Sequence, residues 1–340
     1  MHPAVLAHLS ASGGLITRTD ALDLGVSPLY IASLLRGGSW VLVRRGVYAD
    51  GELWATLDEY REKPLLRARA AVLVMKRGWR LSHDSSAHAQ GLDIVRPDDP
   101  FVHITRPGFT NAWTKSGVKH HLARFAPEQV VEVDGVPALD LARTAVDIAR
   151  ERKELHGVPA CDSARRMGVT LHALWTAAAI MVSWSNVTCV RNSIELSDPG
   201  AQNVAESLGR MLVRELGAGE PETQFPVLLS KGRVAWGDIR VGNHIFEIDG
   251  RIKLRGIDEG GVAVGRLEEV LWEEKKRERL LAQEGLGTSR IFWEDLWGEK
   301  RKLAKLRLRA EYDHTVQRFG TKLPEHLARN ALEIRSRRGA

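Results

Sequence analysis

The sequence has little of what marks secreted or membrane proteins. Its 340 residues include only two cysteines, Cys161 and Cys189. Two distant cysteines make neither a disulfide framework nor a cysteine zinc site, so a reducing cytoplasm is the expected location. No apolar run approaches the ~20 residues of a membrane-spanning helix. The first residues, MHPAVLAHLSASGG, lack the basic start and long apolar run of a signal peptide, and no membrane partner is expected.

What the chain does contain indicates a globular protein of several domains. Hydrophobic residues make up 44% and charged residues 27% of the sequence, which excludes a disordered chain. A length of 340 residues exceeds one ordinary core, so two or three domains are expected. The predicted class is a multidomain α/β protein.

The formal charge of +6 is unevenly distributed along the chain. Residues 299–340 carry twelve Lys and Arg against five Asp and Glu, so the remaining chain sums to −1. This tail, which begins near residue 298, is predicted to be helical. It either contacts a polyanion or forms a solvated helix that covers an apolar edge of the preceding domain.

Residues 1–52 have the helix-capping and turn residues that are typical of a small helical DNA-binding unit. A first helix is predicted over about 3–10, and Thr17 with Asp20 forms a capping pattern for a second. Ser27 caps a third helix, in which Pro28 occupies the first turn. The run WVLVRRGVYAD then predicts a hairpin with arginines at its tip.

This order of helices and hairpin predicts a winged helix-turn-helix, in which the third helix enters the major groove and the wing reaches the backbone. Ile31, Leu34 and Leu35 are expected to be buried. The candidate DNA contacts are Arg18, Tyr30, Ser33, Arg36, Arg44 and Arg45. A three-helix packing module that binds only protein stays open as an alternative, because four Arg against three Asp give this segment little net charge.

The stretch GGLITRTDALDLGVSPLYIASLLRGGSWVLVRRGVYA resembles the N-terminal domain of AbiEi-like antitoxins, the DNA-binding partners in type IV toxin–antitoxin systems. The resemblance implies a winged helix that represses its own promoter, with DNA and a cognate toxin protein as partners. SHDSSAHAQGL and PALDLARTAVDIA are similar to the middle region of the same family.

Residues 60–195 predict a mixed α/β middle domain. LLRARAAVLVM and LDLARTAVDIARER have helical periodicity, whereas FVHITRP and VVEVDGVPAL have strand character. His83, Asp84 and Ser85 are adjacent and therefore cannot converge as a catalytic triad does. His120 and His121 lack metal-ligand spacing and are interpreted as a surface pair.

A domain boundary is predicted at ELSDPGAQ, residues 195–202, and a third domain over 203–297. Its expected order is helix, three strands, a long helix and a strand. Asp238 lies in the second strand, and Glu247 and Asp249 share one face of the third because side chains alternate.

Converging carboxylates of this kind suit Mg²⁺ or Mn²⁺, which would assist phosphodiester hydrolysis. Lys253, with Lys275 or Lys276 further away, would stabilise the transition-state phosphate. The alternative is that Asp249 and Gly250 form a polar turn and that a neighbouring arginine satisfies Glu247.

GDIRVGNHIFEIDGRIK and EEKKRERLLAQEGLGTSRIFWEDL resemble the very-short-patch-repair branch of the PD-(D/E)xK nucleases. The resemblance implies a restriction-endonuclease-like α/β sheet domain with Glu206, Asp238 and Glu247 as its acids. Asp249 stands in place of the usual lysine. A helical wheel predicts Glu206 on the polar side of its helix.

Three functions follow from these patterns. The first is a DNA-binding transcriptional regulator of antitoxin type whose C-terminal domain does not cut. The second is a Mg²⁺-dependent endonuclease targeted by the winged helix. In the third, the middle and C-terminal domains hold a protein partner.

Overall fold

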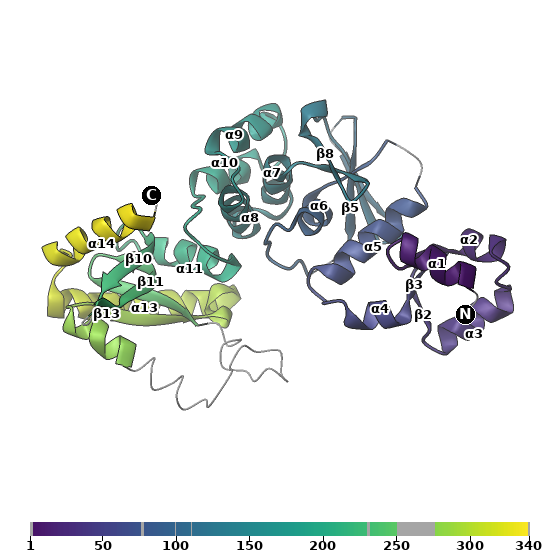
Figure 1. Ribbon diagram of the computed structural model, residues 1–340. Coiled ribbons are helices and arrows are strands. Elements are labelled where there is room, and N and C mark those ends of the chain that lie inside the picture. Colours follow the sequence, from purple (N-terminus) through teal and green to yellow (C-terminus); the bar gives the residue numbers. More distant parts are fainter. Residues whose placement is uncertain are drawn as a thin grey trace. The chain divides into compact units, whose positions relative to one another are not determined.

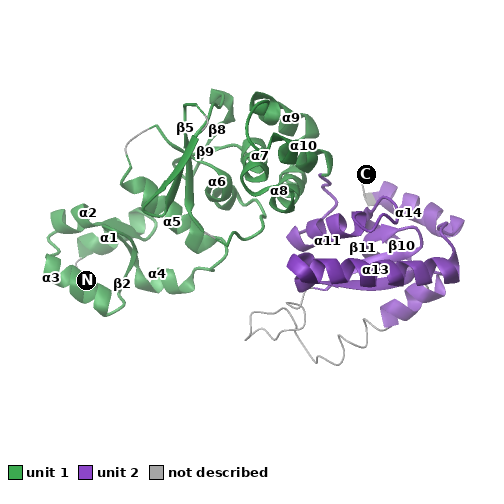
Figure 2. Cartoon of the chain, turned by 180° about the vertical axis from the view of Figure 1, so that it is seen from behind, with its two compact units in different colours: residues 1–196 green, residues 197–340 purple. Residues whose placement is uncertain are grey.

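The computed structural model describes six stretches of the chain, residues 3–75, 78–98, 100–109, 111–229, 232–249 and 276–338. The chain divides into two compact units, residues 1–196 and 197–340 (Figure 2). The protein is mixed α/β, and its described residues contain three sheets. Within the described stretches, no helix combines the length and apolar character needed to cross a membrane. The predicted site residue Lys253 lies outside the described residues.

The first 50 residues form a small helical domain with a three-stranded antiparallel sheet (Figure 1). Its elements are α1 (Pro3–Ala11), β1 (Leu15–Thr17), α2 (Arg18–Asp23), α3 (Pro28–Arg36), β2 (Trp40–Arg44) and β3 (Val47–Asp50). The sheet order β1-β3-β2 places the β2–β3 hairpin at one edge. The predicted helices and hairpin are therefore confirmed, and the arrangement is that of a winged helix.

Local capping explains where these helices begin. The Thr17 hydroxyl accepts a hydrogen bond from the Asp20 amide at 3.1 Å, while the Thr17 amide donates to the Asp20 carboxylate at 3.3 Å. Ser27 caps α3 by accepting from the Tyr30 amide, and Pro28 follows directly after this cap. Each cap satisfies an amide that the first helical turn leaves without a partner.

A six-stranded mixed sheet and its helices complete the first unit. The strands are β4 (Arg80–Leu81), β5 (Val102–Arg106), β6 (Asn111–Lys115), β7 (Val118–Leu122), β8 (Val130–Val133) and β9 (Val136–Leu139). The helices are α4 (Gly51–Thr56), α5 (Glu62–Leu73), α6 (His83–Gln90), α7 (Leu141–Arg152), α8 (Glu154–Arg166), α9 (Leu171–Ala178) and α10 (Val187–Glu195). The sheet order is β6-β7-β5-β4-β9-β8.

Helix α5 contributes to two separate hydrophobic clusters, one with the winged helix and one with the six-stranded sheet. Leu15, Val47 and Ala49 of the small sheet pack against Leu66 and Ala70 of α5. The other end of the unit is a helical layer in which α7 packs against α6, α8, α9 and α10. The winged helix is thus fixed to a larger scaffold within unit 1.

The second unit is a four-stranded sheet covered by helices. Its elements are α11 (Val204–Arg214), β10 (Glu222–Leu228), β11 (Val234–Val241), β12 (His244–Asp249), β13 (Gly287–Phe292), α13 (Gly298–Phe319) and α14 (Glu325–Arg338). Strands β10, β11 and β12 are antiparallel, and β13 joins β12 in parallel. The tail helices α13 and α14 pack on β13 and β10.

The interpretation of His120 and His121 as a surface pair is wrong for His121. Only 1% of its surface is exposed, whereas His120 is half-buried. Alternation along β7 turns the two neighbours to opposite faces of the sheet, and the face that His121 joins is covered.

Candidate functional site

The outer face of α3 carries the residues predicted to contact DNA. Ile31 and Leu34 point into the core and are 1% and 8% exposed. Tyr30, Ser33 and Arg36 are exposed at the spacing that puts residues on one face of a helix. A phenol, a hydroxyl and a guanidinium are groups that contact bases and phosphates in a major groove.

The wing arginines have different surroundings. Arg45 is exposed beside Gly46, whose φ of +79° forms the turn between β2 and β3. Arg44 is half-buried, and desolvation lowers the pKa of its guanidinium. Its Nε has no hydrogen-bond partner among the described residues, and its charge helps to lower the pKa of His120 after burial, the larger cause. Arg45 is therefore the wing residue best placed to meet a phosphate.

The winged-helix domain also has two exposed leucines, on α3 and β2, that the sequence does not indicate as surface residues. Leu29 in the first turn of α3 is 85% exposed, and Leu42 on β2 is 58% exposed. An apolar group beside base edges can contact a thymine methyl. No sequence signal identifies them, because isolated leucines are read by default as core.

Arg18 also points to solvent, at the first position of α2. With Tyr30, Ser33, Arg36 and Arg45 it completes the exposed part of the predicted DNA-binding set. The six-residue set is thus placed on α2, α3 and the wing, with Arg44 the one member that is half-buried rather than exposed.

In the second unit, Glu206 is buried beside Asp238, contrary to the helical-wheel expectation of a polar, outward position. Glu206 is 5% exposed and accepts hydrogen bonds from the Gln202 amide at 2.8 Å and from Asn203 at 2.7 Å. Gln224 donates to it at 3.1 Å. Burial, and to a lesser degree the Asp238 charge, raises the pKa of Glu206. The expectation of an outward-facing Glu206 is wrong because polar partners within the protein, rather than solvent, surround its carboxylate.

Asp238 is engaged with the backbone of the neighbouring strand. Its carboxylate accepts a hydrogen bond from the Ile248 amide at 2.8 Å. Ile248 in turn lies against Gly209 of α11. Asp238 therefore belongs with Glu206 on the α11 side of the unit.

Glu247 and Asp249 lie in a second environment and are paired with arginines. Arg277 donates to Glu247 at 2.8 Å, and Arg290 lies 3.4 Å from Asp249. These four residues line a cavity of about 300 Å³, to which Arg307 also contributes. The alternative in which an arginine satisfies Glu247 is the arrangement observed.

The four predicted acids thus form two pairs with different partners. Among the described residues, they do not supply a group of three ligand atoms close enough to hold one ion. Arg277 and Arg290 already pair with Glu247 and Asp249. As they stand, these residues do not fit Mg²⁺ or Mn²⁺, and the predicted metal stays a prediction.

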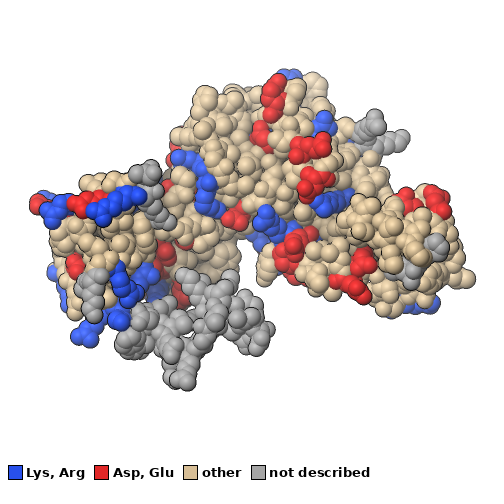
Figure 3. Space-filling view, in the orientation of Figure 1, with Lys and Arg blue, Asp and Glu red and all other residues tan. Residues whose placement is uncertain are grey.

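Several basic residues of the tail are paired with acids of its own unit. Arg301 and Lys305 bind Glu215, Arg307 binds Asp295, and Arg335 binds Glu222. Figure 3 shows basic and acidic side chains interspersed on one face of both units. This packing favours a tail that covers the sheet of its own unit over a tail that binds along a polyanion.

The fold and the exposed α3 face define the start of the chain as a winged-helix module. Residues 3–49 match the family described as "Transcriptional regulator, AbiEi antitoxin". The chain therefore carries an N-terminal domain of this regulator type. No curated protein matches the chain. Among solved structures, the RV2827C protein of Mycobacterium tuberculosis is 18% identical over 60% of this chain and 78% of that one, with a TM-score of 0.38.

Proposed function

We propose that the protein is a DNA-binding transcriptional regulator of antitoxin type. Helix α3 reads the major groove through Tyr30, Ser33 and Arg36, and Arg45 of the wing contacts the backbone. The observation that carries the proposal is the exposed polar face of α3 in a domain that matches a regulator family.

Binding to DNA upstream of its own gene tests this proposal. Fluorescence anisotropy with that fragment, against random DNA of equal length, measures specific and non-specific affinity at several salt concentrations. We expect a double variant, Ser33→Ala with Arg36→Ala, to lose about tenfold or more in specific affinity, because each good base contact contributes ~1–3 kcal/mol. Equal binding by the double variant and the unaltered chain would exclude α3 as the reading helix.

Arg191→Ala is the matched control. Arg191 is an exposed arginine on α10 of the same unit, away from α3 and the wing. Its loss removes one positive charge without touching the proposed face, so affinity should change little. A similar loss in both variants would indicate only a general charge effect.

A toxin protein is proposed as the second partner, on the strength of the antitoxin in the family description. A co-expressed nucleotidyltransferase-like neighbour gene product, if encoded next to this chain, should co-purify with it. Failure to co-purify would leave the regulator without this partner.

Metal-dependent phosphodiester cleavage is the second candidate function, and it requires that Arg277 and Arg290 release Glu247 and Asp249 so that a metal ion can bind. The observation in its favour is the cavity beside Glu247 and Asp249, in which Arg277, Arg290 and Arg307 could turn from their carboxylate partners to a phosphate. Without cleavage, the same cavity would bind a nucleic-acid backbone.

Supercoiled plasmid incubated with the protein and Mg²⁺ or Mn²⁺ separates these outcomes. Nicking that disappears in Glu247→Ala supports the endonuclease. Intact plasmid, or equal nicking by Glu247→Ala, removes it. Neither result affects the α3 proposal, which rests on the other unit.

A further inference from the structure

Three histidines from three elements of the first unit meet in its interior. His83 begins α6, His103 lies on β5, and His121 lies on β7. Strands β5 and β7 pair in parallel, with Thr105 opposite His121, so that His103 and His121 share a face. The three side chains are essentially fully buried, at 1%, 0% and 1% exposure.

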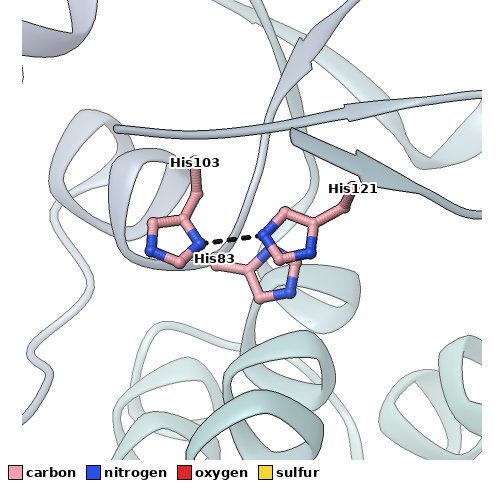
Figure 4. Close-up of side chains that lie close together, drawn as sticks. All are labelled: His83, His103 and His121. Carbon is pink, nitrogen blue, oxygen red and sulfur yellow. Dashed lines mark hydrogen bonds between the residues drawn. The ribbon is translucent and has the colours of Figure 1, made fainter. Parts of the chain in front are cut away.

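The rings are in mutual contact, as Figure 4 shows. Nδ1 of His103 and Nε2 of His121 are 3.0 Å apart, and the rings of His83 and His121 stack with centroids 4.0 Å apart. One nitrogen from each residue lies within 4.8 Å of the other two. Around a tetrahedral ion with bonds of 2.0–2.1 Å, neighbouring nitrogens are about 3.3 Å apart. His83 is stacked on His121, so its ring would have to turn out of that parallel orientation to point a lone pair at the same ion.

Hydrogen bonding leaves this cluster incomplete. Nε2 of His83, Nε2 of His103 and Nδ1 of His121 are buried without a hydrogen-bond partner among the described residues. An unsatisfied buried nitrogen costs free energy, and native interiors rarely tolerate several together. Coordination to a cation would satisfy imidazole lone pairs that the protein leaves unused.

Polar side chains next to the histidine rings hold them in place, in the way that outer-shell partners orient the ligands of a metal ion. Asp84 lies 3.5 Å from Nε2 of His103 and is itself held by Arg152 at 2.6 Å. This carboxylate favours a proton on Nε2 of His103, so that the lone pair of its Nδ1 faces Nε2 of His121, the nitrogen with which it shares a hydrogen bond. Ser82 bonds Nδ1 of His83 at 2.9 Å, which leaves its Nε2 available.

Two further features suit an ion rather than an ordinary core. His83 has φ of +47°, a left-handed conformation that is costly for a residue other than glycine and that gathers at functional sites. Burial of all three rings away from water favours the neutral form of imidazole over the charged form. Neutral imidazole is the form that binds metal.

We propose that His83, His103 and His121 form a binding site for one divalent transition-metal ion, with Zn²⁺ as the preferred occupant. An all-nitrogen set selects ions such as Zn²⁺ over Mg²⁺ or Ca²⁺, which prefer oxygen. Three protein ligands leave a fourth position for water. The ion would link α6, β5 and β7, which belong to the same unit as the winged helix.

Titration of the full-length, chelator-stripped chain with ZnCl2 and CoCl2, after removal of any affinity tag, tests the site. We expect one ion per chain and the visible absorption of four-coordinate cobalt. X-ray absorption at the zinc edge of the unaltered protein should show imidazole nitrogens at about 2.0 Å. No uptake at equimolar metal, or a shell without imidazole, overturns the proposal without requiring any variant.

His121→Gln and His120→Gln form a matched pair. They alter adjacent residues of β7, and His120 is the half-buried neighbour that stacks on Trp113 outside the cluster. We expect His121→Gln to bind cobalt at least tenfold more weakly and His120→Gln to bind as the unaltered chain does. Equal affinity in His121→Gln, or equal loss in both, contradicts the assignment.

Discussion

At the scale of single residues, Arg44 and Arg45 are sequence neighbours with different capacities to bind DNA. Arg45 is exposed at the wing tip, whereas Arg44 is half-buried beside His120. A half-buried guanidinium meets a phosphate only after rearrangement. The two arginines should therefore be separable in a binding experiment.

We predict that Arg45→Ala lowers the salt dependence of DNA binding by about one phosphate contact, a change of ~0.9 in the slope of log K against log salt. Arg44→Ala should change the slope less. Fluorescence anisotropy between low and moderate salt measures both. If Arg44→Ala together with Arg45→Ala binds as tightly as the unaltered protein, the β2–β3 hairpin is not a DNA-contacting wing.

At the scale of elements, helix α2 depends on the reciprocal cap between Thr17 and Asp20. We predict that Thr17→Ala lowers the opening free energy of α2 by about 1 kcal/mol, since the Asp20 amide loses its acceptor. Hydrogen exchange of the α2 amides measures this. Thr19→Ala, an exposed position within the same helix, is the control and should leave the exchange nearly unchanged.

His244 joins three elements of the second unit. Its Nδ1 bonds Thr315 of α13 at 2.7 Å, and its Nε2 bonds Ser289 of β13 at 2.8 Å. Burial lowers the pKa of His244 from 6.5 to about 4. Because the folded-state pKa lies below the unfolded one, the stabilisation is present above pH 6.5 and is lost as the pH falls toward 4.

We predict that this histidine alone removes roughly 3 kcal/mol of stability from the second unit between pH 6.5 and pH 4. Hydrogen exchange of β12 in the unaltered chain and in His244→Gln measures the effect, and the variant should show a flatter pH dependence. His314→Gln, an exposed position on α13, should retain the full dependence. Parallel pH curves for the chain and His244→Gln would contradict the buried-histidine account.

Local signals in the sequence predicted the elements well. Caps, glycine turns and hydrophobic periodicity act within a few residues, and α2, α3 and the β2–β3 hairpin lie where those signals placed them. The DNA-binding face followed directly, because one helical period decides which residues of α3 point outwards.

Contacts between distant segments were beyond the same reasoning. His103 and His121 are 18 residues apart and meet only because β5 and β7 pair in parallel. Arg277, the partner of Glu247, lies 30 residues further along the chain. Neither spacing carries a local signal, so the sequence does not indicate the histidine cluster and leaves open whether a metal or an arginine satisfies Glu247.

At the scale of the whole molecule, charge composition and charge placement lead to different conclusions. The tail contributes a balance of +7 over residues 299–340, which by composition points to a polyanion partner. In the structure, much of that charge is matched by acids of the second unit, including Glu215 and Glu222. The excess of positive charge is therefore a poor guide to where DNA binds.

The division into two units at residues 196 and 197 allows this conclusion to be tested. We predict that a fragment of residues 1–196 binds the upstream DNA within about threefold of the full chain, because α3 and the wing lie wholly in the first unit. The two salt slopes should differ by less than about one phosphate contact, ~0.9. Circular dichroism of the fragment establishes that it is folded before its affinity is compared.

A large loss of slope in the folded fragment would locate DNA contacts in the second unit. Arg318→Ala with Arg329→Ala in the full chain then discriminates further, since both residues are exposed on the tail helices. An unchanged salt slope in this double variant agrees with a tail that packs on the sheet of its own unit and does not contact DNA. A fall of about two contacts would instead show that the tail binds the phosphate backbone, and that the winged helix supplies only part of the affinity.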